Sequence, residues 1–534
     1  MSIILHIETA TKNCSVALSH SGKLLALKEN YSENYSHSEQ LHGFIEKVFK
    51  KADIQMSSID AVAVSKGPGS YTGLRIGVAS AKGLCYALNI PLISISTLKA
   101  MSLGMSKEKK ADLFCPMIDA RRMEVYSAFF DSNNLIKREI IINMEYMASN
   151  LKVQKQLISS KNILIIQDID GVCIPLVKDP MTRELESKYI YAVKEFAEEF
   201  FVLTCGEHEG PRGVNRIIER SLRSTTEPKN KELYLRGLAA CGVEYQDNNG
   251  EISFEGVSEK ELNFLSKVPS LIRPKFNFIV KNIFPELSQE DINFHAVKSI
   301  CETRFSPTIN FNSLFDLVRK DSDKRKLIQI SFEKMMNEII LKAESEGLKN
   351  SFFLHISPNL GNKNGRETIK LSSQDDIGST DIQLLIKGAV KDSGVLFLLN
   401  KFIADKTGKA PFGRNFNFRN SPNSIMGKID LCKRTIQTED MPLIVGVGDT
   451  ITSKKNNGKN YLRGGSDRSF LEFIQILGNE FGINNKIIFV DSSSGEVERP
   501  STKKTGLIGI SDVYDNLKFD MVFKNGPKEY ISWF

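Results

Sequence analysis

A predicted buried strand that ends in a pair of carboxylates constrains this chain most. The apolar run Ile163–Ile166 is followed by Gln167, then by Asp168 and Asp170, and then by Gly171. Residues two apart on extended backbone point to the same face, and open α/β sheets bind ligands at the carboxyl ends of their strands. The pattern therefore predicts a sheet that presents both carboxylates in one site, with a glycine that lets the chain turn away.

Two later apolar runs end in polar residues of a related kind. FFVLTCGEHEG (200–210) places Thr204 at the end of a strand, and MPLIVGVGDTITS (441–453) places Asp449 there. One carboxylate can attack phosphorus while a second protonates the leaving oxygen and then activates water. A hydroxyl group can hydrogen-bond a phosphoryl oxygen, and Mg²⁺ offsets the repulsion between carboxylates and a phosphate dianion. The three strand ends together favour phosphoryl transfer.

These three motifs resemble those of the haloacid-dehalogenase (HAD) phosphatases. The resemblance implies that Asp168 is the nucleophile and that Asp170 is the general acid–base. It also implies that Mg²⁺ is the cofactor, held by Asp168, by the carbonyl group of Asp170 and by Asp449.

Two parts of the HAD pattern stay open. The resemblance requires a lysine between the second and third motifs that holds phosphoryl oxygens together with Thr204. The segment IKGAVKDSGVLFLL offers Lys387 as the first choice and Lys391 as the alternative. Asp467, in RGGSDRSFLEFIQ, is either a second metal contact or the N-cap of the helix that follows it.

The interval 206–375 is too long for a loop and carries strand and helix patterns of its own. We expect it to be a cap domain, inserted between the second and third motifs, that shields the reaction from water and selects the leaving group. Some of its polar residues are candidates for binding sugar hydroxyls, although each could instead serve in surface or core hydrogen bonding. These candidates are Glu207, His208, Arg212, Asn215, Arg216, His355 and Asn359.

From about residue 162 to the end, the resemblance becomes more specific. The segments IIQDIDGVCIPLVKDPMTR, FVLTCGEHEGPRGVNRIIER, HISPNLG and FVDSSSGEVERP are similar to those of the cyanobacterial glucosylglycerol 3-phosphate phosphatases. This implies hydrolysis of 2-O-(α-glucosyl)glycerol 3-phosphate to glucosylglycerol, a compatible solute accumulated under salt stress. Trehalose 6-phosphate and sucrose 6-phosphate remain alternative substrates, because the motifs define the phosphoryl chemistry and not the sugar.

The N-terminal segment GPGSYTGLRIGVASAKGL (67–84) places a glycine-rich turn before a helix rich in small residues. Free backbone amides at such a turn can hold phosphate. The P-loop pattern is incomplete, however, because no Gly-Lys-Ser/Thr follows. We therefore favour the interpretation that the glycines let this helix pack closely against a sheet or a partner.

With HIETATKNCSVAL and MIDARRMEVYSAFF, the same region resembles the dimerisation subunit of the bacterial tRNA threonylcarbamoyladenosine-synthesis complex. The resemblance implies a non-catalytic lobe of the actin/Hsp70-like (ASKHA) fold that docks on the transferase subunit. Members of that family usually carry an aspartate where this chain has Glu8, and most of their second lobe is missing here. The rival interpretation of the whole chain is therefore a tRNA-modification scaffold. Either a gene fusion or a gene-boundary error would explain the two unlike halves.

We therefore predict an α/β protein in which a truncated ASKHA lobe precedes a HAD-like Rossmannoid core with an inserted α+β cap domain. The expected boundaries are 1–140 for the lobe, 141–160 for a junction, 161–205 and 376–534 for the core, and 206–375 for the cap.

Composition limits other classes of function. No stretch approaches the ~20 apolar residues of a membrane helix, and we expect no membrane association. The eight scattered cysteines form no CxxC pair, which predicts reduced thiols in a cytoplasmic protein. The net charge of +7 is mild for 534 residues and the basic runs are short, so we expect no direct nucleic-acid binding.

Overall fold

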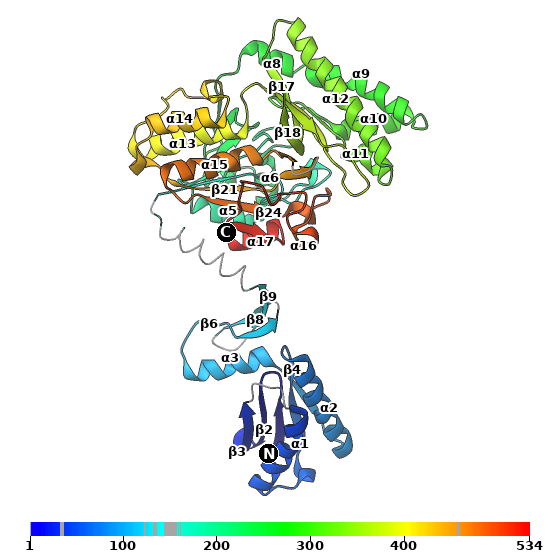
Figure 1. Cartoon of the computed structure of the whole chain (residues 1–534), viewed down its shortest axis with the longest axis vertical. Coiled ribbons are helices and arrows are strands. Elements are labelled where there is room, and N and C mark those ends of the chain that lie inside the picture. The colour runs from blue at the N-terminus through cyan, green and yellow to red at the C-terminus, as the bar shows by residue number, and fades with distance from the viewer. Residues whose placement is uncertain are drawn as a thin grey trace. The chain divides into compact units, whose positions relative to one another are not determined.

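The computed structural model describes residues 2–31, 37–121, 124–131, 136–143, 157, 160, 162–456 and 460–534. The chain divides into two compact units, Met1–Lys152 and Val153–Phe534 (Figure 1). Most of the expected junction 141–160 lies outside the described residues. In the described part of the chain, no helix is both long and apolar enough to cross a membrane.

The main sheet of the N-terminal unit has five strands and two covering helices. Their bounds are β1 Ile3–Glu8, β2 Asn13–His20, β3 Lys23–Tyr31, α1 His37–Ala52, β4 Ala61–Gly67, α2 Tyr71–Leu88 and β5 Leu92–Ser96. The strand order is β3-β2-β1-β4-β5. The pairs β1–β2 and β2–β3 are antiparallel, and the pairs β1–β4 and β4–β5 are parallel. Apolar side chains of both helices join those of the sheet in one cluster.

Helix α2 begins against the turn that follows β1. A β-carbon at Gly73 would lie 2.2 Å from the carbonyl oxygen of Thr9, and one at Gly77 would lie 2.3 Å from the hydroxyl oxygen of the same residue. Both distances are too short for non-bonded atoms, so only glycine permits this approach. The close packing predicted for the glycine-rich segment is confirmed.

The N-terminal unit continues with a helix and a second sheet. Their bounds are α3 Thr97–Glu108, β6 Leu113–Phe114, β7 Met117–Arg121, β8 Glu124–Asp131 and β9 Ile136–Asn143. Strand β8 pairs antiparallel with each of the other three strands. This sheet extends the N-terminal unit slightly past the expected boundary at residue 140.

The C-terminal unit is built on an eight-stranded sheet. Its strands are β10 Ile163–Gln167, β11 Phe200–Leu203, β12 Gly237–Ala239, β13 Glu244–Gln246, β14 Ile252–Phe254, β21 Leu443–Gly448, β24 Lys486–Val490 and β25 Met521–Phe523. Their order is β14-β13-β12-β11-β10-β21-β24-β25. The run from β12 to β25 is parallel, and β13 and β14 add an antiparallel edge.

Helices cover both faces of this sheet. One face carries α5 Ser187–Lys194, α6 Val214–Leu222 and α17 Pro527–Trp533, and the other carries α13 Lys391–Thr407, α14 Ile425–Thr435 and α15 Arg468–Phe481. The short helix α7 Glu227–Asn230 contacts α6. Alternation along β10 serves both faces, because Leu164 and Ile166 pack with α13–α15 while Ile163 and Ile165 pack with the opposite cluster. A buried parallel strand of this kind explains the unbroken apolar run in the sequence.

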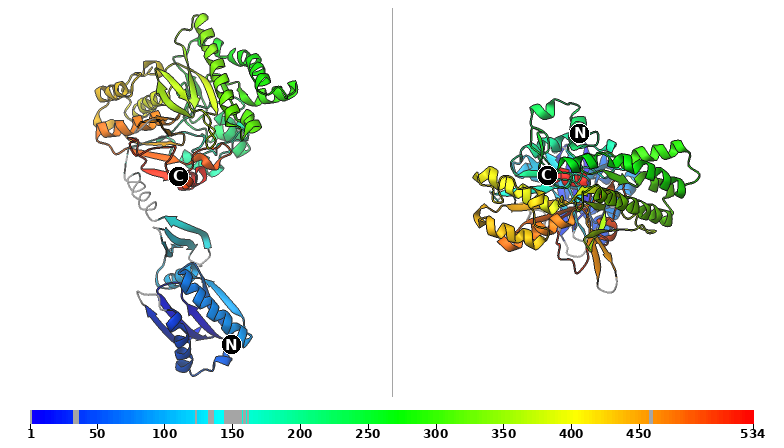
Figure 2. Two further views of the ribbon diagram at one scale, coloured as in Figure 1. Left: turned by 45° about the vertical axis from the view of Figure 1, so that its right-hand side comes forward. Right: turned by 90° about the horizontal axis from the view of Figure 1, so that it is seen from above.

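The cap is a separate α+β layer. Its sheet, in the order β15-β16-β20-β17, is antiparallel throughout. In Figures 1 and 2 the long helices of the cap are green, and they are separate from the core helices α13–α15, which are yellow to orange. The elements are α8 Glu259–Leu265, α9 Val268–Ile283, α10 Gln289–Ser299, β15 Ile300–Cys301, β16 Thr308–Asn310, α11 Asn312–Phe315, α12 Ser322–Ser345, β17 Phe352–Ser357, β18 Asn359–Lys363, β19 Arg366–Ile369 and β20 Asp381–Ile386.

Both expected limits of the cap, 206 and 375, need correction. Strands β12, β13 and β14 lie inside the expected cap, yet they extend the core sheet. Strand β20 lies beyond the expected end, yet it pairs with β16 and β17 of the cap. The cap elements therefore run from α8 to β20. The three core strands are only three residues long each, which leaves too little periodicity in the sequence to distinguish them from cap strands.

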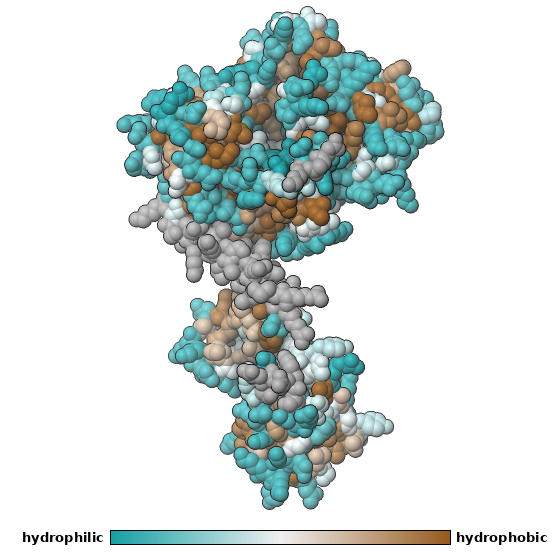
Figure 3. Space-filling view, in the orientation of Figure 1, coloured by the Kyte–Doolittle hydropathy of each residue, from teal (hydrophilic) through white to brown (hydrophobic). Residues whose placement is uncertain are grey.

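The C-terminal unit also contains a short helix and a hairpin. They are β22 Thr452–Lys455, β23 Tyr461–Gly464 and α16 Thr502–Thr505. On the face drawn in Figure 3, the surface of this unit is largely hydrophilic, with scattered apolar patches.

A buried hydrogen-bond network ties β10 to two helices. Gln167 is fully buried, and its side-chain oxygen accepts hydrogen bonds from the hydroxyls of Tyr189 on α5 (2.7 Å) and Tyr530 on α17 (2.6 Å). The glutamine at the end of an apolar strand therefore anchors the strand whose next residue is Asp168.

We expect Gln167→Leu to destabilise the C-terminal unit more than Tyr530→Phe, because it removes the acceptor that two buried hydroxyls share. Loss of one hydrogen bond in Tyr530→Phe should cost about 0.5–1.5 kcal/mol. The measurement is urea unfolding followed by the fluorescence of Trp533, the single tryptophan of the chain. Tyr191→Phe, which removes an exposed bond to Glu227, is the matched control. Equal losses in all three variants would contradict the role of the network.

Candidate active site

Three neighbouring parallel strands bring their carboxyl ends to one edge of the core sheet. Asp168 follows β10, Thr204 follows β11 and Asp449 follows β21. Because β10 pairs with both of the other strands in parallel, the three residues must meet at the same edge. All three are buried. The grouping predicted from the three apolar runs is therefore present in the structure.

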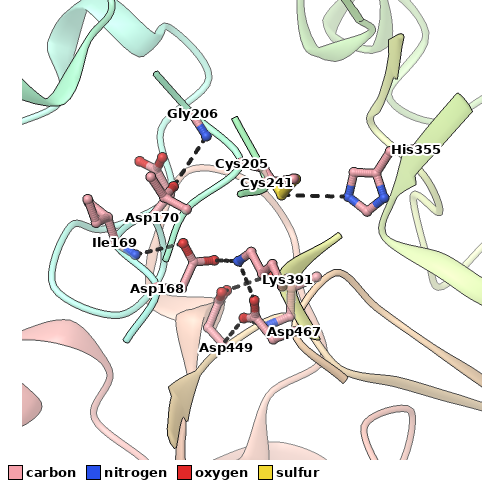
Figure 4. A network of polar contacts seen from close by, with 12 residues as sticks. Asp168, Ile169, Asp170, Cys205, Gly206, Cys241, His355, Lys391, Asp449 and Asp467 are labelled. Carbon is pink, nitrogen blue, oxygen red and sulfur yellow. Dashed lines mark hydrogen bonds and ion pairs between the residues drawn. A yellow bond between two sulfur atoms is a disulfide. The ribbon is translucent and has the colours of Figure 1, made fainter. Parts of the chain in front are cut away.

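A buried lysine joins two carboxylates at this edge (Figure 4). Lys391 Nζ lies 2.6 Å from Asp168 Oδ2 and 2.6 Å from Asp467 Oδ1. The three side chains are 2%, 9% and 0% exposed, respectively. Charged groups that are buried to this extent are stable only when a group of opposite charge lies this close.

Of the two candidate lysines for the phosphate site, the first choice, Lys387, does not line the cavity at this edge, whereas Lys391 does. Lys387 is exposed in the turn after β20, at the end of the cap sheet, and its backbone N–H donates to Ser351. Helix α13 begins four residues later, and its first residue, Lys391, reaches Asp168. The two lysines lie close together in sequence, and only the start of the helix decides which one faces the site.

Asp467 organises the end of β21. Its Oδ2 accepts hydrogen bonds from the backbone N–H groups of Asp449 (2.9 Å) and Thr450 (3.0 Å). It stands at the N-cap of α15, as one of the two interpretations expected, but its side chain makes no capping bond to that helix. The side chain instead turns back toward Lys391 and the strand end.

Burial sets the charges of these groups. The pKa of Asp449 is raised to about 7, mainly by burial and to a smaller extent by the negative charge of the neighbouring Asp467. Burial also raises the pKa of Asp168 well above its usual range, although Lys391 opposes the shift. For Asp467 the effect of burial is outweighed by Lys391 and the two backbone N–H groups, so its pKa lies below the usual range. Two of the three buried carboxyl groups therefore have a raised pKa, although Lys391 contacts Asp168 directly and the charge of Arg499 acts on Asp449.

The carboxylate cluster fits a divalent cation. Oxygen atoms of Asp168, Asp449 and Asp467 lie within 4.8 Å of one another. Among the described residues, Asp449 Oδ2 is buried and has no hydrogen-bond partner. A β-carbon at Gly171 would lie 2.1 Å from this same oxygen. The glycine after the carboxylate pair therefore leaves room for Asp449, and a hard cation such as Mg²⁺ prefers oxygen ligands of this kind.

Asp170 is held by an arginine that the sequence did not single out. Arg183 Nη1 lies 2.8 Å from Asp170 Oδ2, and the same guanidinium donates to the carbonyl oxygens of Pro180 and Arg212. Arg183 follows Asp170 by one loop, and no local pattern marks it. Its position suits an arginine that orients the second carboxylate of the pair.

A cavity of about 780 Å³ opens over these residues between the core and the cap. Asp168, Asp170, Thr204 and Lys391 line it from the core. Of the candidates for binding sugar hydroxyls, Glu207, Arg212 and His355 also line it. Four further lining residues that sequence reasoning missed are Asn310, Asp381, Gln383 and Arg499.

The other candidates lie elsewhere. His208 is fully buried with Nε2 3.1 Å from the carbonyl oxygen of Gly237, and burial lowers its pKa to about 4. Asn215 exchanges hydrogen bonds with Gln246, and Arg216 pairs with Glu219 on its own helix. These three residues serve the fold, as the alternative interpretation of the candidates allowed.

Glu207 and Asn359 mainly link structural parts. Glu207 accepts hydrogen bonds from the backbone N–H groups of Arg304 (2.9 Å) and Phe305 (2.6 Å), which lie in the cap. Asn359, on the cap, accepts a hydrogen bond from the N–H group of Gly465 (3.2 Å), which lies before α15 of the core, and it lines a neighbouring cavity of about 480 Å³. Both residues fasten the cap next to the site.

The expectation that all cysteines are reduced thiols is wrong for two of them. Cys205 and Cys241 form a disulfide, 36 residues apart in sequence. The other six cysteines are free. No spacing rule could find this pair, because parallel pairing of β11 with β12 is what brings the two strand ends together.

The C-terminal unit is similar in sequence to a known family. Residues 162–534 match a family model described as glucosylglycerol-phosphate phosphatase. The glucosylglycerol-phosphate phosphatase of Synechocystis sp. is 38% identical over 395 residues, which cover 71% of this chain and 93% of that protein. The C-terminal domain of the trehalose-6-phosphate phosphatase of C. albicans matches 72% of this chain and 94% of its own, with 12% identity and a TM-score of 0.34.

The N-terminal unit has different relatives. Residues 32–161 match a family model described as tRNA N6-adenosine threonylcarbamoyltransferase. The tRNA threonylcarbamoyladenosine biosynthesis protein TsaB of Escherichia coli is 36% identical over 134 residues, which cover 25% of this chain and 57% of that protein. The structure of YeaZ from Pseudomonas aeruginosa covers 27% of this chain and 68% of its own, with 29% identity and a TM-score of 0.25. The chain thus spans little more than half the length of the E. coli relative.

We expect Lys391→Met to lower the free energy of unfolding of the C-terminal unit by about 3–5 kcal/mol at neutral pH, because it removes the positive charge that contacts two buried carboxylates. The deficit should shrink as the pH falls. Burial already raises the folded pKa of Asp168, and loss of the lysine removes the group that opposes this shift, so the variant regains stability at low pH, where Asp168 is protonated.

The control for this variant is Lys387→Met, which should change stability by no more than about 0.5 kcal/mol because Lys387 is exposed. Urea midpoints from Trp533 fluorescence across a pH series measure both variants. A similar, pH-independent loss in the two would show that the buried ion pair contributes nothing specific.

Proposed function

This chain belongs, through residues 162–534, to the glucosylglycerol-phosphate phosphatase family, and from that premise we propose that it hydrolyses 2-O-(α-glucosyl)glycerol 3-phosphate to glucosylglycerol and phosphate. The observation that carries the proposal is the buried Asp168–Lys391 pair, which lies at the carboxyl edge of a parallel sheet and lines a cavity large enough for a sugar phosphate.

Asp168 is the nucleophile in this proposal. One of its carboxylate oxygens attacks phosphorus, and the bond between phosphorus and the glycerol oxygen breaks. Its Oδ1 accepts a hydrogen bond from the N–H group of Ile169 (2.8 Å), and its Oδ2 is held by Lys391. These contacts orient the carboxylate in advance, so little motion is needed at the moment of attack.

Asp170 moves the protons. In the first step its carboxyl group gives a proton to the leaving glycerol oxygen. In the second step the carboxylate takes a proton from a water molecule that attacks the aspartyl-phosphate, and the bond between phosphorus and Asp168 breaks. Arg183 keeps Asp170 in place through both steps by its 2.8 Å ion pair.

The remaining charge is offset by donors and a cation. Thr204 lines the cavity at the end of β11, where its hydroxyl can donate to a phosphoryl oxygen, and Lys391 supplies a positive charge beside it. Asp168, Asp449 and the carbonyl group of Asp170 would hold Mg²⁺, which neutralises phosphate charge when bound.

The cap supplies the groups for the sugar. Polar residues of β16 and β20 line the cavity opposite the carboxylates, among them Asn310, Asp381 and Gln383. The side-chain oxygen of Gln383 is buried and, within the described part of the chain, has no hydrogen-bond partner. Sugar hydroxyls are donors that would satisfy it.

We expect purified protein with Mg²⁺ to release phosphate from glucosylglycerol 3-phosphate faster than from trehalose 6-phosphate or sucrose 6-phosphate. Asp168→Asn should lower the rate by at least about a thousandfold, because the nucleophile is lost, and EDTA should stop the reaction. Colorimetric detection of phosphate measures all three substrates.

Asp405→Asn is the matched control, since Asp405 is an exposed aspartate near the far end of α13. It should keep full activity. Turnover that is equal on the three substrates would contradict the proposed specificity, and folded protein that releases no phosphate from any of them would contradict the activity.

A second function is favoured for the N-terminal unit by its 36% identity to E. coli TsaB. We propose that this unit docks on a tRNA N6-adenosine threonylcarbamoyltransferase through α2. Closely packed glycines hold one side of that helix against the turn that follows β1, while Tyr86 is 92% exposed on the helix.

We expect the full chain to retain a purified bacterial transferase of this class in a pull-down. Tyr86→Glu should weaken the complex at least about tenfold, because it places a charge in an apolar contact. Tyr31→Glu, on strand β3, is the control because Tyr31 is also exposed (66%) but lies on another element. No retention by the wild-type chain, or equal weakening by both variants, would contradict docking through α2.

A further inference from the structure

Two sulfur atoms and a histidine nitrogen meet beside the proposed phosphatase site. Cys205 directly follows Thr204, Cys241 lies in the turn between β12 and β13, and His355 is on the cap strand β17. His355 Nε2 lies 4.0 Å from the sulfur of Cys205. Ligand atoms of all three residues lie within 4.8 Å of one another. Figure 4 shows the ring of His355 facing the two cysteines.

The histidine is oriented as a ligand would be. His355 Nδ1 lies 2.9 Å from Oε1 of Glu367 on β19, which suits Nδ1 as a donor and leaves Nε2 facing the sulfurs, where it can bind a metal once it carries no proton. Glu367 is itself fixed, because its Oε2 accepts hydrogen bonds from Ile356 (2.8 Å) and Asn359 (3.0 Å). A carboxylate behind the far nitrogen of a histidine is the usual support of a metal-binding imidazole.

The donor set selects a different cation from the carboxylate cluster. Two thiolates and an imidazole suit Zn²⁺ and similar borderline-soft divalent ions, whereas Mg²⁺ prefers the oxygens of Asp168 and Asp449. Three protein ligands also leave a fourth position for water or an anion. The two clusters can therefore hold different metals in neighbouring positions.

We propose that Cys205, Cys241 and His355 form a second metal site, for Zn²⁺ or a similar ion, which exists only when the disulfide between the two cysteines is reduced. A dithiol reductant passes two electrons to the disulfide and becomes a disulfide itself, leaving two thiols. Each thiol loses one proton when its sulfur binds the metal. The disulfide and the metal site exclude each other because they use the same sulfur atoms.

The location of the site gives it a consequence for catalysis, and this part rests on the proposed phosphatase function. The N–H group of Cys241 donates to the carbonyl oxygen of Thr204 (3.0 Å). Cys205 and His355 line the substrate cavity, and together with Lys391 they also line the adjoining cavity. A cation here would compete with Thr204 and Lys391 for the phosphate, so metal loading should inhibit the enzyme.

Co²⁺ is the probe for the test, because a cobalt–thiolate bond gives a charge-transfer absorption in the near ultraviolet that carboxylate ligands do not give. The full chain is reduced with a dithiol, separated from it without oxygen, and titrated at mildly alkaline pH. We expect the band to saturate at one equivalent of cobalt per chain and to be absent from oxidised protein.

Variants separate this site from other thiols. Cys241→Ser and Cys205→Ser should each abolish the saturable band, and Glu367→Gln should weaken cobalt binding by about 10–100-fold. Cys301→Ser should keep the band, since Cys301 is a buried free thiol that lines the same cavity but stands outside the cluster.

The proposal is overturned if reduced wild-type protein shows no thiolate band, or if Cys241→Ser shows the full band. Inhibition of phosphate release by Zn²⁺ in reduced wild-type protein, but not in Cys241→Ser, would support the link to catalysis. The cobalt absorption is measured without substrate. The metal site can therefore be tested even if the protein shows no phosphatase activity.

Discussion

The ion pair of Lys391 with Asp168 and Asp467 is the contact on which the rest of the site depends. Lys391 is the first residue of α13, and Asp467 stands at the N-cap of α15. The lysine therefore joins the starts of two helices to the end of β10. Desolvation makes such a cluster unfavourable unless every charge is paired. The same requirement holds the helices and the strand in one arrangement and gives the site its charge.

Close approach of backbone segments is the second constraint. Gly171 leaves space for Asp449, and Gly448 leaves space for Asp467, since a β-carbon there would lie 2.8 Å from the aspartate side chain. The carboxylates can crowd together only because these neighbours carry no side chain. Burial then raises the pKa of Asp449 to about 7, which is a cost that a bound cation would remove.

Much of this arrangement could be predicted from the residues that follow three apolar runs. Asp168, Thr204 and Asp449 are adjacent in the structure because parallel strands present their carboxyl ends at one edge. The prediction of Lys387 as the lysine of the site is wrong, because the sequence pattern around it does not indicate where α13 begins. The predicted start of the cap, at residue 206, is too early, because the short strands β12–β14 extend the core sheet from β11 and do not join the cap sheet. His208 and Asn215 serve the fold and not the site. Their hydrogen bonds to Gly237 and Gln246, which are distant in sequence, show this role.

The sequence by itself determined the two unlike halves, the parallel core and the chemistry of the strand ends, because these depend on local patterns and on motifs that occupy consecutive residues. The tertiary structure alone decided the partner of each charge and of each thiol. Arg183 reaches Asp170 across a loop, Cys241 reaches Cys205 across two paired strands, and His355 arrives from the cap. Such contacts depend on how elements far apart in the chain pack, and no single stretch of sequence encodes that packing.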